Sequence, residues 1–198
     1  MTTWVASDIH LNHLNILKYC PHRGGPETSW EKVGKMNETI ISNWNSVVQP
    51  EDEVWILGDV AMGQIEKAPA LVRRLNGTKH LVKGNHDKTI VKLPEANELF
   101  ATIATYYELN YKMDGDKHLI CMSHFPMMHW NGQSADINRT SIHLHGHMHS
   151  SPDKLHRCNG AILDVGIDGN NLFPRKMDDA IKLALNHAKL NPSNSHHS

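Results

Sequence analysis

Five short segments of this sequence end in polar side chains that bind divalent metals. The side chains are carboxylates, imidazoles and one amide: Asp8, His10, Asp59, Asn85, His124, His147 and His149. A charge buried without a partner is costly, so a carboxylate directly after an apolar run such as 2–6 needs a cation or a hydrogen-bonded network. A mixed nitrogen and oxygen set suits Mn, Fe, Zn or Ni better than the all-oxygen set that Mg²⁺ prefers. The sequence therefore predicts metal-dependent chemistry.

The spacing within two of these segments has a geometric explanation. In an extended segment alternate side chains share a face, so Asp8 and His10 can point at one ion. His147 and His149 can do the same for a second ion. The two oxygens of Asp59 can bridge two ions that lie about 3.5–4 Å apart. Two half-sites with a shared carboxylate are the expected arrangement.

Each polar cluster lies at the end of a segment with the composition of a strand. Strands are predicted over 2–7, 53–59, 79–87, 106–113, 117–124, 141–147 and 161–167, with a hairpin turn at 113–117. Helices are predicted over 28–48, 64–75 and 174–190. The first helix carries a capping-box signature, in which Thr28 precedes Glu31 by three residues. This alternation is typical of α/β or layered α+β domains.

The composition favours one globular domain. With 198 residues, 39% of them hydrophobic, the chain can bury a sizeable core, so we assign 1–190 to a single domain. The polar segment 191–198 is expected to be a disordered tail. Three cysteines without C-x-x-C spacing favour a reducing, cytoplasmic location. No apolar run approaches the roughly 20 residues that span a bilayer.

The net charge and the histidine content limit the kinds of ligand that the protein is expected to bind. A net charge of −1 gives no general basic footprint for nucleic acid polymers, and a small phosphorylated ligand stays open. Sixteen histidines are several times the usual number, which favours metal or acid–base chemistry. A homodimer also stays open.

The order of the polar blocks resembles the calcineurin-like metallophosphoesterase family, whose pattern is D-x-H, G-D, G-N-H-[DE], H and G-H-x-H. All five blocks occur here in order, between residues 8 and 149. The resemblance implies an α/β fold, a four-layer α/β/β/α sandwich with two mixed sheets flanked by helices. It also implies two divalent ions per chain, Mn²⁺ first, with Fe, Zn, Ni or Co as alternatives. One ion would take Asp8, His10, Asp59 and His149, and the other would take Asp59, Asn85, His124 and His147.

The resemblance further implies a reaction, the hydrolysis of a phosphodiester or phosphomonoester. A hydroxide that bridges the two ions would attack phosphorus in line. His86 would face the substrate and stabilise the phosphoryl oxygens or protonate the leaving group, while Asp87 would orient His86 and favour its protonated form. The alternative for Asp87 is an N-cap of the segment that follows it. A nucleotide or cyclic nucleotide has the expected substrate size.

Four further residues are candidates for substrate contacts. They are His13, Arg23, Trp130 and Arg139. His13 is either a substrate contact or a hydrogen-bond partner of a metal ligand. Trp130 can stack on a base or anchor a loop by packing, and Arg139 can hold a phosphate or be a surface charge. Arg23 is a second candidate for a phosphate contact.

Two other classes of protein stay open. A non-catalytic metal-binding scaffold or protein-interaction module on the same fold predicts a gap among the ligands or at His86, and the sequence has no such gap. A structural zinc site predicts four ligands that are usually rich in cysteine, whereas all three cysteines lie outside the motifs.

Overall fold

The computed structural model describes residues 1–25, 27–133, 140–149 and 160–190. The predicted tail 191–198 and the candidate contact Arg139 lie outside these residues. No helix in the described ranges is long and apolar enough to cross a membrane.

The first sheet has the strand order β4-β3-β2-β1-β9. Its strands are β1 (Thr3–Ala6), β2 (Glu53–Ile56), β3 (Thr78–Val82), β4 (Thr102–Ala104) and β9 (Arg175–Lys176). β1 to β4 run parallel and β9 pairs antiparallel with β1, so the sheet is mixed. The carboxyl ends of the parallel strands consequently meet at one edge.

The second sheet has the order β5-β6-β7-β8. Its strands are β5 (Tyr106–Met113), β6 (Asp116–Ser123), β7 (Thr140–His145) and β8 (Ile162–Asp164). β5 and β6 form the predicted antiparallel hairpin, whereas β6, β7 and β8 run parallel, so this sheet is also mixed.

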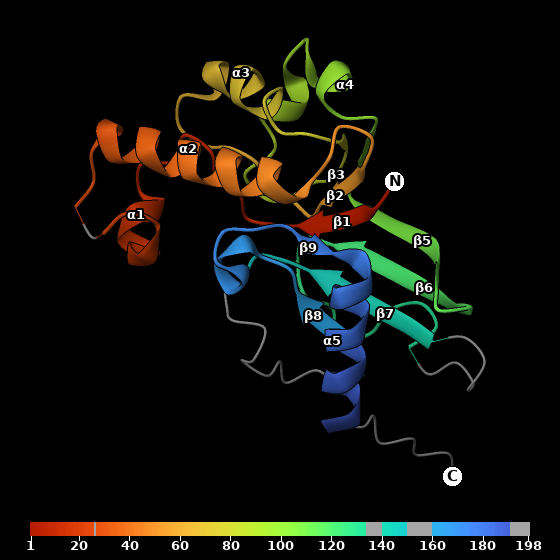
Figure 1. Ribbon diagram of the computed structural model, residues 1–198. Helices are drawn as coiled ribbons and strands as arrows, with labels where there is room; N and C mark the ends of the chain where they lie inside the picture. The colour runs from red at the N-terminus through yellow and green to blue at the C-terminus, as the bar shows by residue number, and fades with distance from the viewer. Residues whose placement is uncertain (26, 134–139, 150–159, 191–198) are drawn as a thin grey trace.

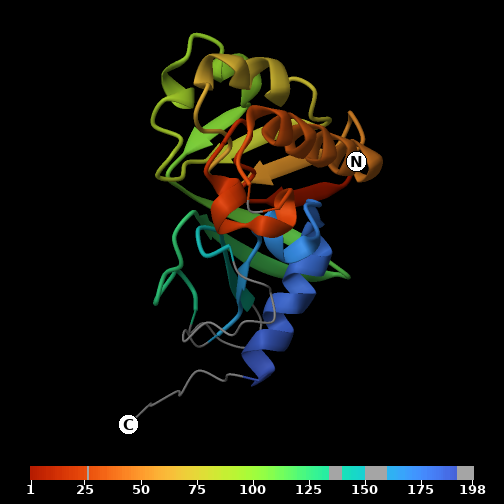
Figure 2. The same ribbon diagram turned by 90° about the vertical axis from the view of Figure 1, so that its left-hand side faces the viewer.

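The described helices lie against both sheets. The α-helices are α1 (Ile16–Tyr19), α2 (Trp30–Val47), α3 (Ala68–Val72), α4 (Ala96–Leu99) and α5 (Met177–Leu190). Short 3₁₀ helices lie at Pro21–Arg23, Ile65–Lys67, Ile90–Lys92 and Ile167–Asn170. Figures 1 and 2 show α2, α3 and α4 on the outer face of the first sheet, and α5 beside the second sheet. Two mixed sheets flanked by helices confirm the predicted fold class.

Two buried clusters hold these layers together. One packs α2 against the first sheet, with Trp44 and Ile40 among its fully buried side chains. The other lies between the two sheets, where Val5 and Leu57 meet Ile120 and Ile142. Each fully buried aliphatic side chain contributes roughly 1.5–3 kcal/mol, so the sheets are held as one body.

The predicted helix boundaries differ from the observed ones in three places. The segment predicted as one helix over 64–75 is a 3₁₀ helix at Ile65–Lys67 followed by the short helix α3, which ends at Val72. Helix α2 begins at Trp30, and its N-cap is Ser29, whose hydroxyl accepts from the Lys32 amide, not Thr28. The closing helix begins at Met177, because residues 175–176 add β9 to the first sheet.

The predicted strands that lead into the polar clusters end earlier than expected. β1, β2, β3 and β7 stop at Ala6, Ile56, Val82 and His145. The polar residues therefore lie on loops beyond the strands. These loops are tied together by backbone hydrogen bonds, such as those from the amides of Asp8 and His10 to the carbonyls of Gly58 and Asp59, at 3.0 and 2.9 Å.

Candidate metal centre

The first group of candidate ligands combines the loops after β1 and β7. The Nε2 atoms of His10 and His149 are 3.2 Å apart, and they lie 4.0 and 3.7 Å from Oδ1 of Asp8. That oxygen is fully buried and has no hydrogen-bond partner among the described residues. An orphaned carboxylate oxygen facing two imidazole nitrogens has the donor chemistry of a cation site.

The second group combines the ends of β2, β3, β6 and β7. Asp59, His124 and His147 offer ligand atoms that lie within 4.8 Å of one another. His124 Nε2 lies 3.0 Å from the amide oxygen of Asn85. His124 Nδ1 donates to the Leu57 carbonyl at 2.8 Å, which directs Nε2 toward Asn85 and Asp59 as the candidate ligand nitrogen.

Asp59 lies between the two groups. Its Oδ2 atom is 3.8 Å from His10 Nε2 in the first group and 3.5 Å from His124 Nε2 in the second. Its Oδ1 atom accepts the His86 backbone amide at 2.9 Å, which fixes the direction of the carboxylate. This geometry fits a shared ligand for two cations, so the residues present fit the two-ion centre that the motifs imply.

The backbone explains how neighbouring residues reach different groups. Asp8, His10, Asp59, His147 and His149 all have positive φ angles, between 48° and 71°. The prediction from an extended backbone, that His147 and His149 point at one ion, is therefore wrong: His147 belongs to the second group and His149 to the first. Left-handed conformations at non-glycine residues cost of order 1 kcal/mol or more each and gather at functional sites.

Two glycines allow the loops to approach closely. A Cβ atom at Gly146 would overlap the Ser7 side chain, and a Cβ atom at Gly84 would overlap the carboxylate of Asp59. The glycines of the G-H-x-H and G-N-H-D blocks therefore have a packing function beside the ligands.

Burial and hydrogen bonding separate the pKa values of the ligands. Burial raises the pKa of Asp8 to about 6. Burial also opposes ionisation of Asp59, but hydrogen bonds from His124 and from the His86 amide lower its pKa to about 2. Burial lowers the pKa of His10, whereas a hydrogen bond to Asp168 overcomes burial and raises the pKa of His149 to about 10. A metal ion must displace a proton from His149 to bind there, so we expect metal affinity to fall with decreasing pH.

Asp168 is a residue of the site that no sequence motif marked. Its Oδ2 accepts from Nδ1 of His149 at 2.7 Å, which directs Nε2 toward Asp8. Carboxylates that orient metal-binding histidines in this way are common, so an acidic partner was to be expected. Nothing in the segment around residue 168 distinguished it from other loop positions. Cys20 Sγ lies 3.8 Å from the same Nδ1 atom.

Arg23 forms hydrogen bonds with Asp168 and with the loop after β1. Its buried guanidinium forms a double hydrogen bond with the Asp168 carboxylate, at 2.7 Å each, and donates to the carbonyls of Asp8 and Ile9 at 2.6 and 2.8 Å. The side chain has no exposed surface with which to reach a substrate. The expected phosphate contact is thus replaced by an internal one.

Asp87 also has a different position from the expected one. Its two buried carboxylate oxygens accept the backbone amides of Asp59, Val60 and Gly84, at 2.7–2.9 Å. The described contacts include none between this carboxylate and the His86 ring, and the carboxylate does not cap the following segment. Asp87 therefore holds the loops after β2 and β3 together, which positions Asp59 and Asn85.

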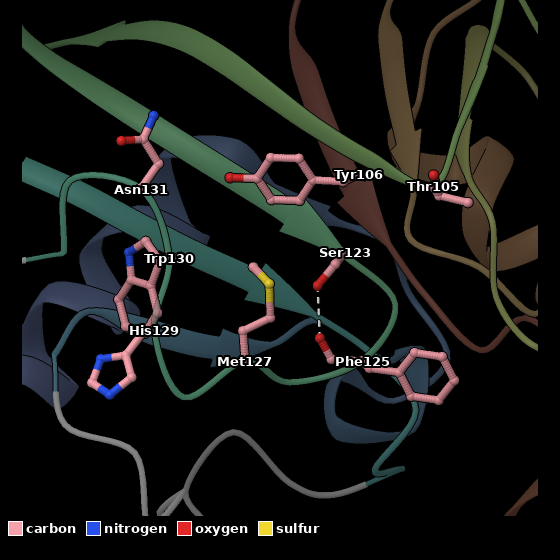
Figure 3. Close-up of a pocket in the computed structure, with 8 residues that line it drawn as sticks. All are labelled: Thr105, Tyr106, Ser123, Phe125, Met127, His129, Trp130 and Asn131. Atoms are coloured by element: carbon pink, nitrogen blue, oxygen red, sulfur yellow. Dashed lines mark hydrogen bonds between the residues drawn. The ribbon is translucent and has the colours of Figure 1, made fainter.

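The remaining predicted residues lie at different distances from the centre. The His86 ring is part-exposed, with Nε2 3.9 Å from Oδ2 of Asp59. His13 Nδ1 lies 3.2 Å from His10 Nδ1. Trp130 is only 8% exposed and packs against Leu119 and Ile162 of the second sheet, which favours its packing alternative. It also lines a cavity beside that sheet (Figure 3).

Known proteins resemble this chain over most of its length. A family model described as calcineurin-like phosphoesterase matches residues 1–198, so the chain belongs to that family. It is 31% identical over 185 residues to the uncharacterized protein MJ1445 of Methanocaldococcus jannaschii, covering 91% of this chain and 89% of that one. It is 27% identical over 187 residues to the Gene 66 protein of Mycobacterium phage L5, covering 84% and 86%.

A solved structure has the same fold. The protein of unknown function AQ665 from Aquifex aeolicus superimposes with a TM-score of 0.65 at 23% identity, covering 92% of this chain and 98% of that one. This likeness concerns the fold alone.

A first prediction concerns Asp8→Asn in metal-free protein. A carboxyl group with a raised folded pKa loses stability as pH rises from its ordinary value of 3.8 through about 6, so at pH 8 the buried charge is destabilising. We expect Asp8→Asn in EDTA at pH 8 to raise the free energy of unfolding by about 1–3 kcal/mol, and therefore the unfolding temperature. This gain should shrink at pH 5. The same variant should lose most of the stabilisation that Mn²⁺ gives. Thermal unfolding with and without metal measures both, and an unchanged metal-free midpoint at pH 8 would contradict the assignment.

A second prediction concerns Asp168→Asn. The loss of the charged acceptor for His149 should weaken Mn²⁺ binding by roughly 10–100-fold, as outer-shell substitutions commonly do. Asp52→Asn is the matched control, because Asp52 is a buried carboxylate that accepts from the Trp4 indole and the Thr2 and Gln49 amides. It should lower stability without changing metal affinity. Equilibrium dialysis with Mn²⁺ separates the two, and equal affinity in both variants would remove Asp168 from the site.

Proposed function

We propose that the protein is a two-metal phosphoesterase that hydrolyses a phosphodiester or phosphomonoester of nucleotide size. The observation that carries this proposal is the position of Asp59 between two groups of histidine and carboxylate side chains, with the His86 ring at their rim. Membership of the calcineurin-like phosphoesterase family supports the reaction class.

The shape of the site supports a small phosphorylated substrate. A cavity of about 390 Å³ opens over the two groups and is lined by His10, His13, Asp59, His86 and His147, among others. Its volume accommodates a phosphoryl group with a small substituent. It is part-open, which allows one end of a longer substrate to leave the centre.

The proposed mechanism assigns separate tasks to the side chains. Bound cations, with Mn²⁺ as the first candidate, would activate the attacking water and neutralise the charge on the phosphoryl oxygens. Asp59 would keep the two cation positions apart by a fixed distance, because its direction is set by the His86 amide. The His86 ring would donate a hydrogen bond to a phosphoryl oxygen or a proton to the leaving oxygen.

His13 supports the metal ligands in this proposal. Burial lowers the pKa of His13 to about 4, so its ring is neutral at pH 7. A neutral ring next to His10 Nδ1 can accept a hydrogen bond from it and leave His10 Nε2 free for a cation.

The proposed function is tested by a substrate screen with metal-loaded protein. Nucleotides, cyclic nucleotides, short oligonucleotides and bis-p-nitrophenyl phosphate cover the mono- and diester classes. Turnover of any of them distinguishes an enzyme from a metal-binding scaffold, which would bind the ions and turn over none.

A third prediction concerns the metal itself. We expect two divalent ions per chain after loading, because the two ligand groups are separate and the Asp59 carboxylate lies between them. A chelator should abolish turnover, and Mn²⁺ should restore it, with Ni²⁺ or Co²⁺ as weaker substitutes. Elemental analysis of the loaded protein gives the count, and one ion per chain would contradict the shared-ligand assignment.

A fourth prediction isolates His86. Because its ring is assigned to the substrate, His86→Ala should keep both ions while turnover falls by roughly 10²–10⁴-fold. p-Nitrophenolate needs little protonation, so the loss should be smaller on p-nitrophenyl esters than on nucleoside esters.

The matched control for His86 is His80→Ala. That ring stacks on Trp55 away from the centre, and its loss should leave turnover nearly unchanged. Equal losses of the His86 variant on both ester classes would indicate phosphoryl-oxygen stabilisation, and loss of an ion would make His86 a ligand.

A further inference from the structure

A second cavity adjoins the metal centre and carries a different chemistry. It has a volume of about 550 Å³, and three of its lining residues are Lys83, Lys88 and Lys92, so we call it the lysine pocket. Lys83 follows β3, and the other two lysines lie on the segment after the G-N-H-D block. None of the residues that line it is acidic.

The lysine pocket shares a wall with the metal centre. Asn85 lines the pocket, and its amide oxygen is the one that lies 3.0 Å from His124 Nε2. Phe125 lines it as well, and its ring packs edge-on against the rings of His124 and His147, with centroids 5.0 and 4.7 Å apart. A molecule bound at the centre can therefore continue into the pocket past these two side chains.

The three lysines have no counter-charge within the described part of the chain. No ion pair or side-chain hydrogen bond involves them there, whereas Lys32 and Lys35 pair with Glu27 and Glu31 on the surface of α2 or just before it. Like charges that gather around one cavity repel each other, and an anion in that cavity relieves the repulsion. Phosphate is the anion that a phosphoesterase substrate supplies.

A third cavity adjoins the lysine pocket. It has a volume of about 630 Å³ and shares Thr105 and Phe125 with the lysine pocket. Figure 3 shows Tyr106, Met127 and Phe125 around it. At its far side Glu108 accepts from the Tyr106 hydroxyl at 2.7 Å and from the Asn131 amide. A carboxylate there disfavours a second anion, whereas an uncharged ring fits the aromatic walls.

We propose that the lysine pocket binds the phosphate that follows the scissile one in a short single-stranded oligonucleotide, with the next base in the aromatic cavity. The proposal rests on the proposed function, because it places the scissile phosphate at the metal centre. A positive groove followed by aromatic side chains is the arrangement that binds single strands without sequence preference. In the reaction water adds to the scissile phosphorus, and the ester oxygen leaves with a proton.

The test compares two p-nitrophenyl esters that differ by one phosphate. One is thymidine 5′-(p-nitrophenyl phosphate), and the other carries an additional 3′-phosphate. The wild-type protein should prefer the second ester by about 5–20-fold in kcat/KM, through KM. The double variant Lys88→Ala/Lys92→Ala should lose this preference and retain its rate on the first ester.

The matched control is Lys112→Ala/Lys117→Ala, which removes two exposed lysines paired across the β5–β6 hairpin, away from the site. It should keep the preference. Binding of a fluorescein-labelled trithymidylate to metal-free protein, followed by anisotropy, gives a readout without turnover. The pocket variant should bind about 5–20-fold more weakly, with a salt dependence reduced by one to two ions, and the control should bind as the wild type does.

The outcomes separate this inference from the proposed function. Equal hydrolysis of both esters, together with pocket and control variants that behave alike, would overturn the pocket and leave the phosphoesterase intact. If neither ester is hydrolysed but trithymidylate binding depends on Lys88 and Lys92, the pocket stands and the reaction is wrong. Trithymidylate binding that is equal in all three proteins overturns the pocket whatever the turnover.

Discussion

The buried carboxylates at the strand ends are the constraint on which the site depends. Asp8 and Asp59 lie within 4 Å of imidazole nitrogens from four different loops, yet one oxygen of Asp8 has no hydrogen-bond partner among the described residues. Such a group is unfavourable unless a cation compensates it. The family to which the chain belongs is that of the calcineurin-like phosphoesterases, and cations at these positions would give the carboxylates their partners.

The fold holds this unfavourable arrangement by using other groups as supports. Asp87 collects three backbone amides from the loops that carry Asp59 and Asn85, and Arg23 joins Asp168 to the carbonyls of the first loop. Both supports are buried, charged and placed outside the ring of candidate ligands. Loops with left-handed backbone at their ligand residues need such cross-links, because each positive φ angle is itself unfavourable. The hydrogen bonds of Asp87 and Arg23 thus help to offset the unfavourable backbone conformations of the candidate ligands.

The sequence predicted which side chains gather at the candidate centre better than it predicted their geometry. Residue type and chain order sufficed to find the candidate ligands and the strands before them, because both are local properties. The idea that residues two apart share a face failed at His147 and His149, since the chain has already left β7 at that point. The pairing of Arg23 with Asp168 was not predictable, because the contact spans 145 residues and has no spacing that marks it. Asp87 was found as a member of a motif, but its partners are backbone amides. Every residue except proline has such an amide, so residue types do not indicate these contacts.

The net charge of the sequence likewise did not indicate how the charges are distributed in the structure. A net charge of −1 argued against a nucleic acid partner, and that argument holds for a molecule with evenly spread charges. Here the acidic residues that balance the basic ones lie elsewhere: Glu27, Glu31 and Glu38 pair with cations on or near α2, and Glu98 pairs with Arg73. The three lysines beside Asn85 have no ion-pair partner among the described residues. Because a charged molecule responds to the local field within about 10 Å and not to the sum over the chain, a near-neutral protein can still present a cationic surface beside its candidate metal centre.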